Sequence, residues 1–315
     1  MSALAVLWFF LIFVLIAGYF VLDGFDLGVG VLYRALAKTD AERALVRRSI
    51  GPVWDGNEVW LLTAGGALFA AFPAAYATTF SGFYLAVMLV LFGLIVRAVS
   101  LEFGAHDPKW GRVWDACFTV GSFLPALLLG VALGNVIAGV PLAANGDYAG
   151  VPLLGLLSPF TLVVGALGFA MCMAAGAAWV ALKTERTSAV HGRAEKQRRV
   201  WQIGALVLFV VATVLAFTVV KPQFAPGMLG AGVIFAIAFV ACIAASIAQA
   251  KKGSDLAAFV LQSIAAVCLV ALAAVSLFPN LVVAVPGSVG ESITLMSAAS
   301  SDTSLAWMTG IACIG

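Results

Sequence analysis

The side chains with the clearest chemical potential are ionisable groups that interrupt long apolar runs in the N-terminal part of the sequence. They are Asp23, Asp26, Asp55, Glu58, Arg97, Glu102 and Asp115. A carboxylate at the centre of a bilayer costs about 3 kcal/mol on insertion scales, so such groups usually face a bundle interior or a water path. Asp23 and Asp26 share one helical face, as do Asp55 and Glu58, because residues three apart are neighbours on a helix.

These acids allow two interpretations. Carboxyl groups separated by water, with Arg97 available to keep some of them ionised, are what a proton path from one side of a membrane needs. Alternatively, the same carboxylates cap helices, pair with Arg97 or sit in the aqueous headgroup zone. The residues alone leave both interpretations open.

The segment 51–60, with the sequence GPVWDGNEVW, is unusually polar for the start of an apolar run. Trp54 and Trp60 are typical of anchors at a membrane interface. Asp55, Asn57 and Glu58 exceed what anchoring requires, so the segment is expected to have a polar function as well.

The sequence predicts no metal or haem ligands. His106 and His191 both fall in basic connecting segments, where solvated histidines are expected rather than axial ligands. The cysteines are scattered singly through apolar stretches without a CxxC or Cys/His spacing, which argues against a zinc site or a disulfide framework. They are interpreted as small apolar side chains inside helices.

The amino-acid composition indicates whether the folded chain is surrounded by water or by lipid. Of 315 residues, 63% are hydrophobic and only 10% are charged, and the mean hydropathy is +1.10. A soluble domain is about half apolar and a quarter charged, so a bilayer is the expected surrounding. The net charge of +2 gives no indication of a nucleic-acid partner.

Apolar runs predict an all-α integral membrane protein with about nine transmembrane helices. The expected spans are 4–32, 50–72, 79–99, 115–138, 157–180, 201–220, 227–248 and 257–278, with a ninth beginning near Ser304 and truncated in this chain. The first run lacks a basic leader and a cleavage site, so it is expected to be a retained anchor.

All basic residues except Lys221 lie in the segments 33–49, 97–114, 181–200 and 249–256. The positive-inside rule then places these segments in the cytoplasm and the N-terminus outside. The basic segment 181–200 is either a seam between two four-helix bundles or an ordinary solvated loop. The expected organisation is a single membrane domain of two four-helix bundles plus a final helix. Its parts are a first four-helix bundle with the internal acids and the entry to the fifth span at 1–180, the basic cytoplasmic loop at 181–200 and the remaining transmembrane helices at 201–315.

Several strings closely resemble subunit II of cytochrome bd-type quinol oxidases, including the cyanide-insensitive variants. They are DGFDLGVG at 23–30, GPVWDGNEVWLLTAGGALFA at 51–70, SGFY at 81–84, GSFLP at 121–125 and GN at 134–135. The similarity covers most of the first 140 residues. Beyond residue 157, topology and a few short strings such as SPF at 158–160 are similar.

The resemblance implies a subunit of a bacterial inner-membrane oxidase that oxidises quinol and reduces dioxygen to water, taking protons from the cytoplasm. It implies two haems b and one haem d held by a larger partner, subunit I, and none bound by this chain alone. A small single-helix accessory subunit, membrane lipid, quinol and a bound quinone are further partners that the family suggests.

By position, the resemblance assigns the proton path to Asp26, Asp55, Arg97 and Glu102, with Trp54, Asp23 and Glu58 in support. Glu102 stands where the family is expected to have Asp. A rival interpretation is a secondary transporter, which also combines many helices with internal carboxylates. The gathering of the acids on one side of the first helices favours the oxidase.

Overall fold

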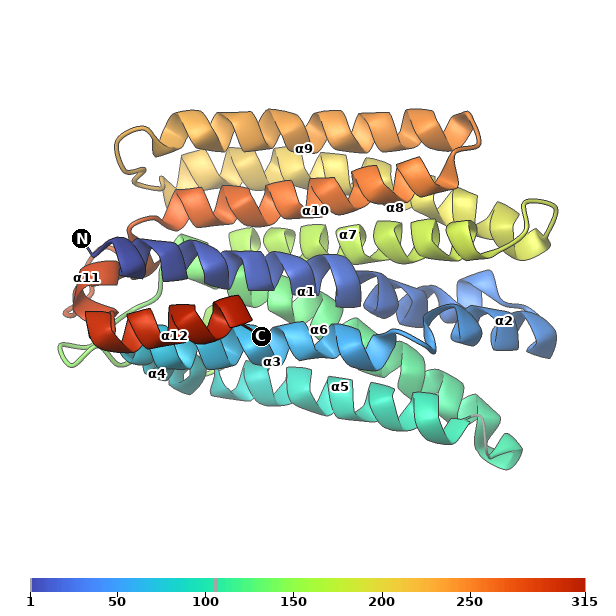
Figure 1. Cartoon of the computed structure of the whole chain (residues 1–315), viewed down its shortest axis with the longest axis horizontal. Helices are drawn as coiled ribbons and strands as arrows, with labels where there is room; N and C mark the ends of the chain where they lie inside the picture. The colour runs from blue at the N-terminus through green and yellow to red at the C-terminus, as the bar shows by residue number, and fades with distance from the viewer. Residues whose placement is uncertain (1, 105–106, 315) are drawn as a thin grey trace.

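The computed structural model describes residues 2–104 and 107–314, and it is almost entirely helical (Figure 1). The helices are α1 (Ala3–Leu36), α2 (Asp40–Ile50), α3 (Trp54–Ala71), α4 (Pro73–Gly82), α5 (Tyr84–Gly104), α6 (Gly111–Ala138), α7 (Pro159–Lys183), α8 (Ala189–Leu215), α9 (Met228–Lys251), α10 (Asp255–Leu277), α11 (Leu295–Ala298) and α12 (Asp302–Ile314). Short 3-10 turns cover Pro108–Trp110 and Leu154–Leu156, and a π-helical turn, Ala216–Val220, extends α8. A two-stranded antiparallel sheet pairs β1 (Asn280–Val282) with β2 (Ile293–Thr294).

The predicted all-α membrane architecture is confirmed. Among the described residues, seven helices are long and apolar enough to span a membrane: α1, α5, α6, α7, α8 with its π-helical extension, α9 and α10. The span expected at 50–72 forms α3, whose 18 residues begin with a polar turn. The last expected span forms α12, of which 13 residues are described. By length and apolarity, seven of the described helices qualify as spans, and the expected count of about nine is not confirmed.

The long helices form two neighbouring groups (Figure 1). One group consists of α7, α8, α9 and α10, and the neighbouring group consists of α1, α3, α5 and α6. Helix α1 also packs along α7 and α10, so it joins the two groups. The chain passes from one group to the other between α6 and α7, and residues 181–200 connect two helices of the same group.

We call the right-hand end of the bundle in Figure 1 the basic end, because the segments 33–49, 97–114, 181–200 and 249–256 meet there. In at least two of these segments, helices replace most of the expected loop. Residues 40–50 form α2, residues 181–183 are the end of α7, and residues 189–200 are the start of α8. Long helices project beyond an apolar core readily because their ends carry charged side chains that reach water.

Helix α2 is held to the bundle by charged contacts. Thr39 and Glu42 form a capping box at its start. The Glu42 carboxylate lies 2.6 Å from Nη2 of Arg193 on α8, and Arg193 Nε donates to the carbonyl oxygen of Leu36 over 2.7 Å. The Arg193 hydrogen bond, with backbone donors at Lys38 and Thr39, lowers the pKa of Glu42 to about 2.

Helix α1 is the centre of the molecule. Every residue from 23 to 30 is buried, which for a helix means contact with neighbours on all sides. Gly28 meets α7 so closely that an added Cβ would overlap the backbone carbonyl of Cys172, and a Cβ on Gly176 would overlap the backbone of Gly28. Small residues at this crossing let the two helix backbones touch, as is typical of membrane helices.

We predict that Gly28→Ala destabilises the protein by about 1–3 kcal/mol, because the added methyl group must push two packed backbones apart. Thermal unfolding of the purified membrane protein checks this. The matched control is Gly204→Ala on α8, where an added Cβ meets nothing within 4 Å. Equal midpoints for the two variants would contradict the close α1–α7 contact.

Candidate functional site

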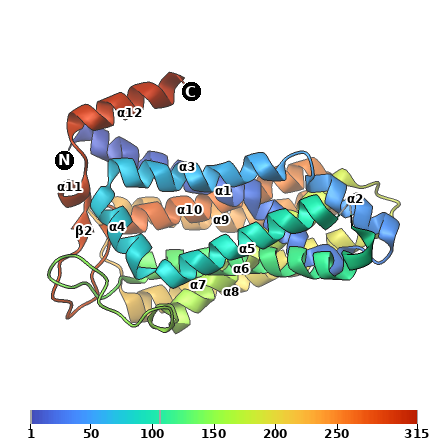
Figure 2. The same cartoon turned by 90° about the horizontal axis from the view of Figure 1, so that it is seen from below.

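Three helices bring ionisable and amide side chains together inside the bundle, and we call this group the acid–arginine cluster. Its members are Asp23 and Asp26 of α1, Asn57 and Glu58 of α3, and Arg97 of α5. Asp23, Asp26 and Arg97 are completely buried. Helix α3 runs beside α1 (Figure 2). Helix α5 packs closely on α6 at this level, because an added Cβ on Gly121 of α6 would overlap the backbone nitrogen of Arg97.

The strongest contact in the cluster joins Arg97 to Asp23. Nη1 of Arg97 donates to Oδ2 of Asp23 over 3.1 Å, and Nη2 donates to Oδ1 over 2.5 Å. This is the bidentate geometry of an arginine–carboxylate pair, in which two parallel N–H···O hydrogen bonds join the guanidinium to the carboxylate. Ser100 adds a hydrogen bond to the carbonyl oxygen of Arg97 over 2.6 Å, which ties its side chain to the same turn of α5.

Asp26 depends on α3 for its contact. Nδ2 of Asn57 donates to Oδ2 of Asp26 over 2.8 Å and lies 3.3 Å from the carbonyl oxygen of Leu22. Oδ1 of Asp26 has no hydrogen-bond partner among the described residues. An amide donor stabilises either a carboxylate or a carboxylic acid, so this site can hold Asp26 in both protonation states.

Glu58 connects the cluster to the protein surface. Its Oε1 lies 3.4 Å from Nη2 of Arg97, and its side chain is 22% exposed, whereas Arg97 and Asp23 are not exposed at all. Oε1 of Glu58, Nε of Arg97 and the hydroxyl of Tyr19 also lack hydrogen-bond partners within residues 2–104 and 107–314. Buried polar atoms of this kind are costly unless they are solvated or paired, so the cluster is suited to exchange protons or water.

The remaining residues expected in the proton path lie outside the cluster. Asp55 is exposed in the first turn of α3, one turn nearer the basic end than Glu58, and the Trp54 side chain beside it is 9% exposed. Glu102 is exposed on α5, five residues after Arg97 and about 7.5 Å along the helix from it. The structure therefore gathers Asp23, Asp26, Glu58 and Arg97, and places Asp55 and Glu102 at the approach from the basic end.

Asn57 of the cluster, and Tyr19 and Ser100 next to the cluster, are absent from the sequence-based assignment of the proton path. Asn57 stands within the polar segment 51–60, but its bond to Asp26 needs the contact between two helices. Tyr19 lies four residues before Asp23, and Ser100 lies three after Arg97, so helical spacing places both on the same faces as the charged residues. That spacing was the available signal.

Asp115 has a different role. Its Oδ1 lies 2.7 Å from Nη2 of Arg47, and its Oδ2 lies 3.8 Å from Nε of Arg43. These pairs join α2 to the start of α6 at the basic end. Asp115 therefore fits the alternative of a structural partner.

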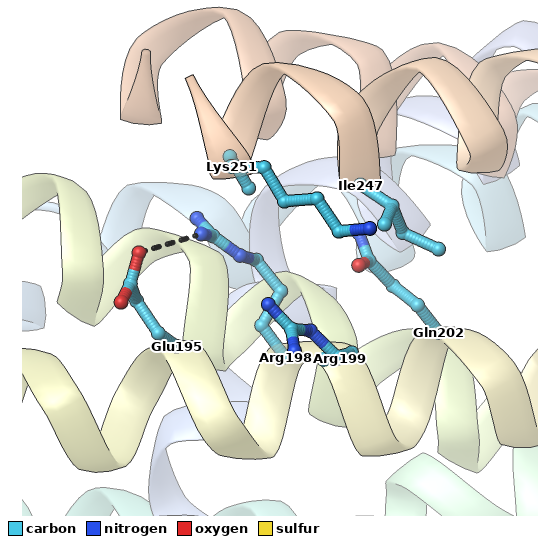
Figure 3. Close-up of a pocket in the computed structure, with 7 residues that line it drawn as sticks. Glu195, Arg198, Arg199, Gln202, Ile247 and Lys251 are labelled. Carbon is cyan, nitrogen blue, oxygen red and sulfur yellow. Dashed lines mark ion pairs between the residues drawn. The ribbon is translucent and has the colours of Figure 1, made fainter. Parts of the chain in front are cut away.

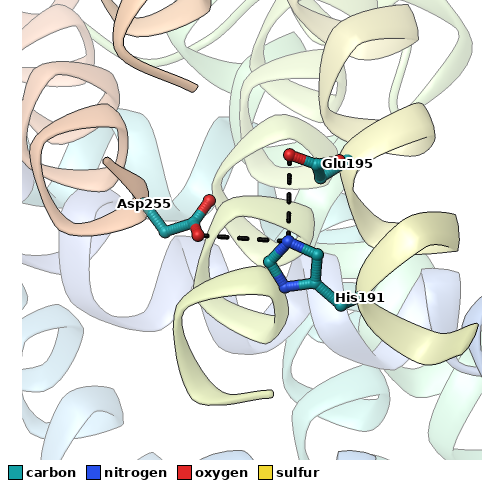
Figure 4. A group of neighbouring side chains, drawn as sticks. All are labelled: His191, Glu195 and Asp255. Carbon is teal, nitrogen blue, oxygen red and sulfur yellow. Dashed lines mark ion pairs between the residues drawn. The ribbon is translucent and has the colours of Figure 1, made fainter. Parts of the chain in front are cut away.

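A second polar group surrounds His191, which is buried at 4% exposure rather than solvated as expected (Figure 4). His191 lies in α8, and its Nδ1 is 3.1 Å from the carbonyl oxygen of Ala181. Its Nε2 is 3.8 Å from Glu195 and 4.0 Å from Asp255. The expectation of a solvated loop histidine was wrong, because this segment is helical and places the His191 ring beside Ala181 of α7 and Asp255 of α10. His106 lies outside the described residues.

His191, Glu195 and Asp255 present ligand atoms within 4.8 Å of one another, as a metal site would. The carboxylates already have cationic partners, however. Asp255 lies 3.1 Å from Arg198 and 3.2 Å from Arg186, and Glu195 lies 3.5 Å from Arg198. A metal ion would have to displace these guanidinium groups, so the geometry favours a structural ion-pair network that ties α8 to α10.

The comparisons with known proteins agree on one family. The family described as cytochrome bd terminal oxidase subunit II matches residues 4–315. The cytochrome bd-I ubiquinol oxidase subunit 2 of Escherichia coli K12 is 33% identical over 348 residues, which cover 99% of this chain and 90% of that protein. A probable cytochrome oxidase subunit 2 of Haemophilus influenzae is 43% identical over 218 residues, which cover 67% of this chain and 57% of that protein.

The fold has a solved counterpart in the bd oxidase of Geobacillus thermodenitrificans. The TM-score is 0.80 at 13% identity, over 99% of this chain and 94% of that one. This likeness shows the architecture, and the family match sets aside the rival interpretation as a secondary transporter. The chain therefore belongs to the family of cytochrome bd terminal oxidase subunit II.

Proposed function

We propose that this chain is the haem-free second subunit of a terminal oxidase that oxidises quinol and reduces dioxygen to water. In this proposal it supports a haem-bearing subunit I and supplies that subunit with protons. The family match and the relative described as a ubiquinol oxidase subunit support the reaction. The observation that carries the proton role is the buried acid–arginine cluster, which holds three carboxyl groups and a single guanidinium. Asp23 and Glu58 contact Arg97, and Asp26 follows Asp23 by three residues on α1.

Charge balance explains why this cluster would carry protons. If all three carboxyl groups were ionised, the cluster would hold two negative charges in excess of Arg97. An interior of low dielectric strongly disfavours such an excess, so we infer that the carboxyl groups share at least one proton. A proton held this way can move between Asp26 and Glu58 when water bridges Oδ1 of Asp26 and Oε1 of Glu58, which accept no hydrogen bond from the described residues.

The direction of uptake follows from the basic end. We propose that this end faces the cytoplasm of a bacterial inner membrane, with the N-terminus outside, because basic connections are retained on the cytoplasmic side. Asp55 and Glu102 then lie at the cytoplasmic approach, and Glu58 and Asp26 lie deeper. Arg97 positions Asp23 and favours the ionised form of its neighbours.

We propose, as the family implies, that the two haems b and the haem d are held by subunit I, where they supply the oxygen chemistry. Two side chains of types that ligate haem already have partners here: Nδ1 of His191 lies 3.1 Å from the carbonyl oxygen of Ala181, and Met171 accepts a hydrogen bond from Gln262 through its sulfur. Quinol, a small accessory subunit and a quinone bound to this chain remain part of the same family-based proposal.

The complex itself is tested by spectroscopy. Protein purified from membranes through a tag on this chain should bring one larger partner and give haem b and haem d bands in a reduced-minus-oxidised spectrum. Mass spectrometry identifies the partner. A colourless single polypeptide from well-assembled membranes would contradict the oxidase assignment.

The proton role is tested at Asp26. We predict that Asp26→Asn lowers oxidase turnover about ten- to hundred-fold while leaving haem content unchanged, because the amide keeps the shape but cannot accept the proton. Asp55→Asn and Glu102→Gln should cause smaller losses, because both side chains are exposed and water can bypass them. Asp40→Asn, at a side chain that is 97% exposed, is the matched control. Unchanged turnover in Asp26→Asn would remove the proposed role.

The structural part of the cluster is tested separately. We predict that Arg97→Gln costs about 3–5 kcal/mol of stability, because it leaves the Asp23 carboxylate buried without a counter-charge. The double variant Asp23→Asn/Arg97→Gln should recover much of that loss, since both charges are then removed. Thermal midpoints and the yield of assembled complex measure both effects. A double variant no more stable than Arg97→Gln would contradict the pairing.

A further inference from the structure

A polar cavity lies between α8 and α9 at the basic end, away from the acid–arginine cluster (Figure 3). Its volume is about 240 Å³, and its charged and polar lining residues are Glu195, Arg198, Arg199, Gln202 and Lys251. Clefts that take drug-sized ligands occupy about 300–1,000 Å³. This cavity is smaller, so it suits one compact polar group.

The cavity has an excess of positive charge. The Arg198 side chain is 2% exposed and already pairs with Asp255 at 3.1 Å and with Glu195 at 3.5 Å. Arg199 and Lys251 form no ion pair within residues 2–104 and 107–314. Glu195 is the one carboxylate in the lining of the described cavity, and both it and the neighbouring Asp255 pair with Arg198. The charges of Arg199 and Lys251 therefore remain available to an anion.

An apolar surface continues from the cavity along the membrane-spanning parts of both helices. On α8, Ile203 and Val207 follow Arg199 at intervals of four residues and are 51% and 58% exposed. On α9, Val240 shares a face with Lys251 and is 42% exposed. A molecule with a charged head in the cavity would therefore have apolar side chains beside its tail.

We propose that this cavity binds the phosphate group of an anionic phospholipid, with Arg199 and Lys251 as the direct contacts and the acyl chains lying along α8 and α9. Basic pockets between transmembrane helices recognise such headgroups, and a guanidinium matches the geometry of phosphate oxygens. Arg198 lies behind the contact residues and fixes the floor of the cavity through its bond to Asp255. The site goes beyond the proton role and does not depend on it.

The test uses the complete complex, stripped of lipid in detergent and titrated with phosphatidylglycerol while native mass spectrometry counts the bound molecules. Each cation near an anionic lipid strengthens binding about five-fold, so the double variant Arg199→Gln/Lys251→Gln should bind one lipid about thirty-fold more weakly. The control Arg112→Gln/Lys252→Gln removes the same charge from exposed positions at the same end and should bind as the parent does. Arg198 is left intact because its loss would strand a buried carboxylate.

Two further arms identify the ligand. Phosphatidylcholine, whose ammonium group cancels the phosphate charge, should not compete, and inorganic phosphate should compete only weakly. Equal losses in the two double variants, or full competition by phosphatidylcholine, would overturn the site. Tight binding of inorganic phosphate in place of phosphatidylglycerol would overturn the lipid as its source.

Discussion

The buried pair between Arg97 and Asp23 is the constraint on which the first group of helices depends. A guanidinium taken out of water loses several kcal/mol of solvation, and a carboxylate loses a similar amount, so each needs the other in good geometry. Two hydrogen bonds of 2.5 and 3.1 Å supply that geometry between α5 and α1. At the same level of the bundle, α5 and α6 pack closely, because an added Cβ on Gly121 would overlap the backbone nitrogen of Arg97.

A buried cluster that only stabilised the fold would need no ionisable groups beyond the pair of Arg97 and Asp23. Instead, α1 adds Asp26 and α3 adds Glu58, so the carboxyl groups outnumber the cation, and several polar atoms lack partners. Replacing buried ionic groups by packed apolar ones is often neutral or stabilising, so an acid excess of this kind needs another reason. Proton transfer is such a reason, because it requires groups that change charge without reorganising the surrounding helices.

The sequence predicts the helices well and their contacts poorly. Apolar runs predict spans because backbone groups in lipid must be paired within a helix, and the helices lie close to the expected positions. Whether Asn57 meets Asp26 depends on how α3 rotates against α1, which a local pattern does not contain. His191 shows the same limit: its basic neighbours in the sequence suggested a solvated position, but the ring contacts Ala181 of α7 and Asp255 of α10, and neither contact is visible in a local pattern.

The balance of charge separates the roles of the polar groups in this bundle. Around His191, two guanidinium groups face two carboxylates, and the pairs are complete enough to act as a clamp between α8 and α10. Next to it, Arg199 and Lys251 leave a positive excess at the cavity between α8 and α9, which favours a bound anion. The acid–arginine cluster has more carboxyl groups than cations, and Asp23, Asp26 and Arg97 within it are fully buried. An acid excess at a buried site is most readily neutralised by a bound proton. The sign of the charge excess and the degree of burial together therefore indicate which ligand each polar group can bind.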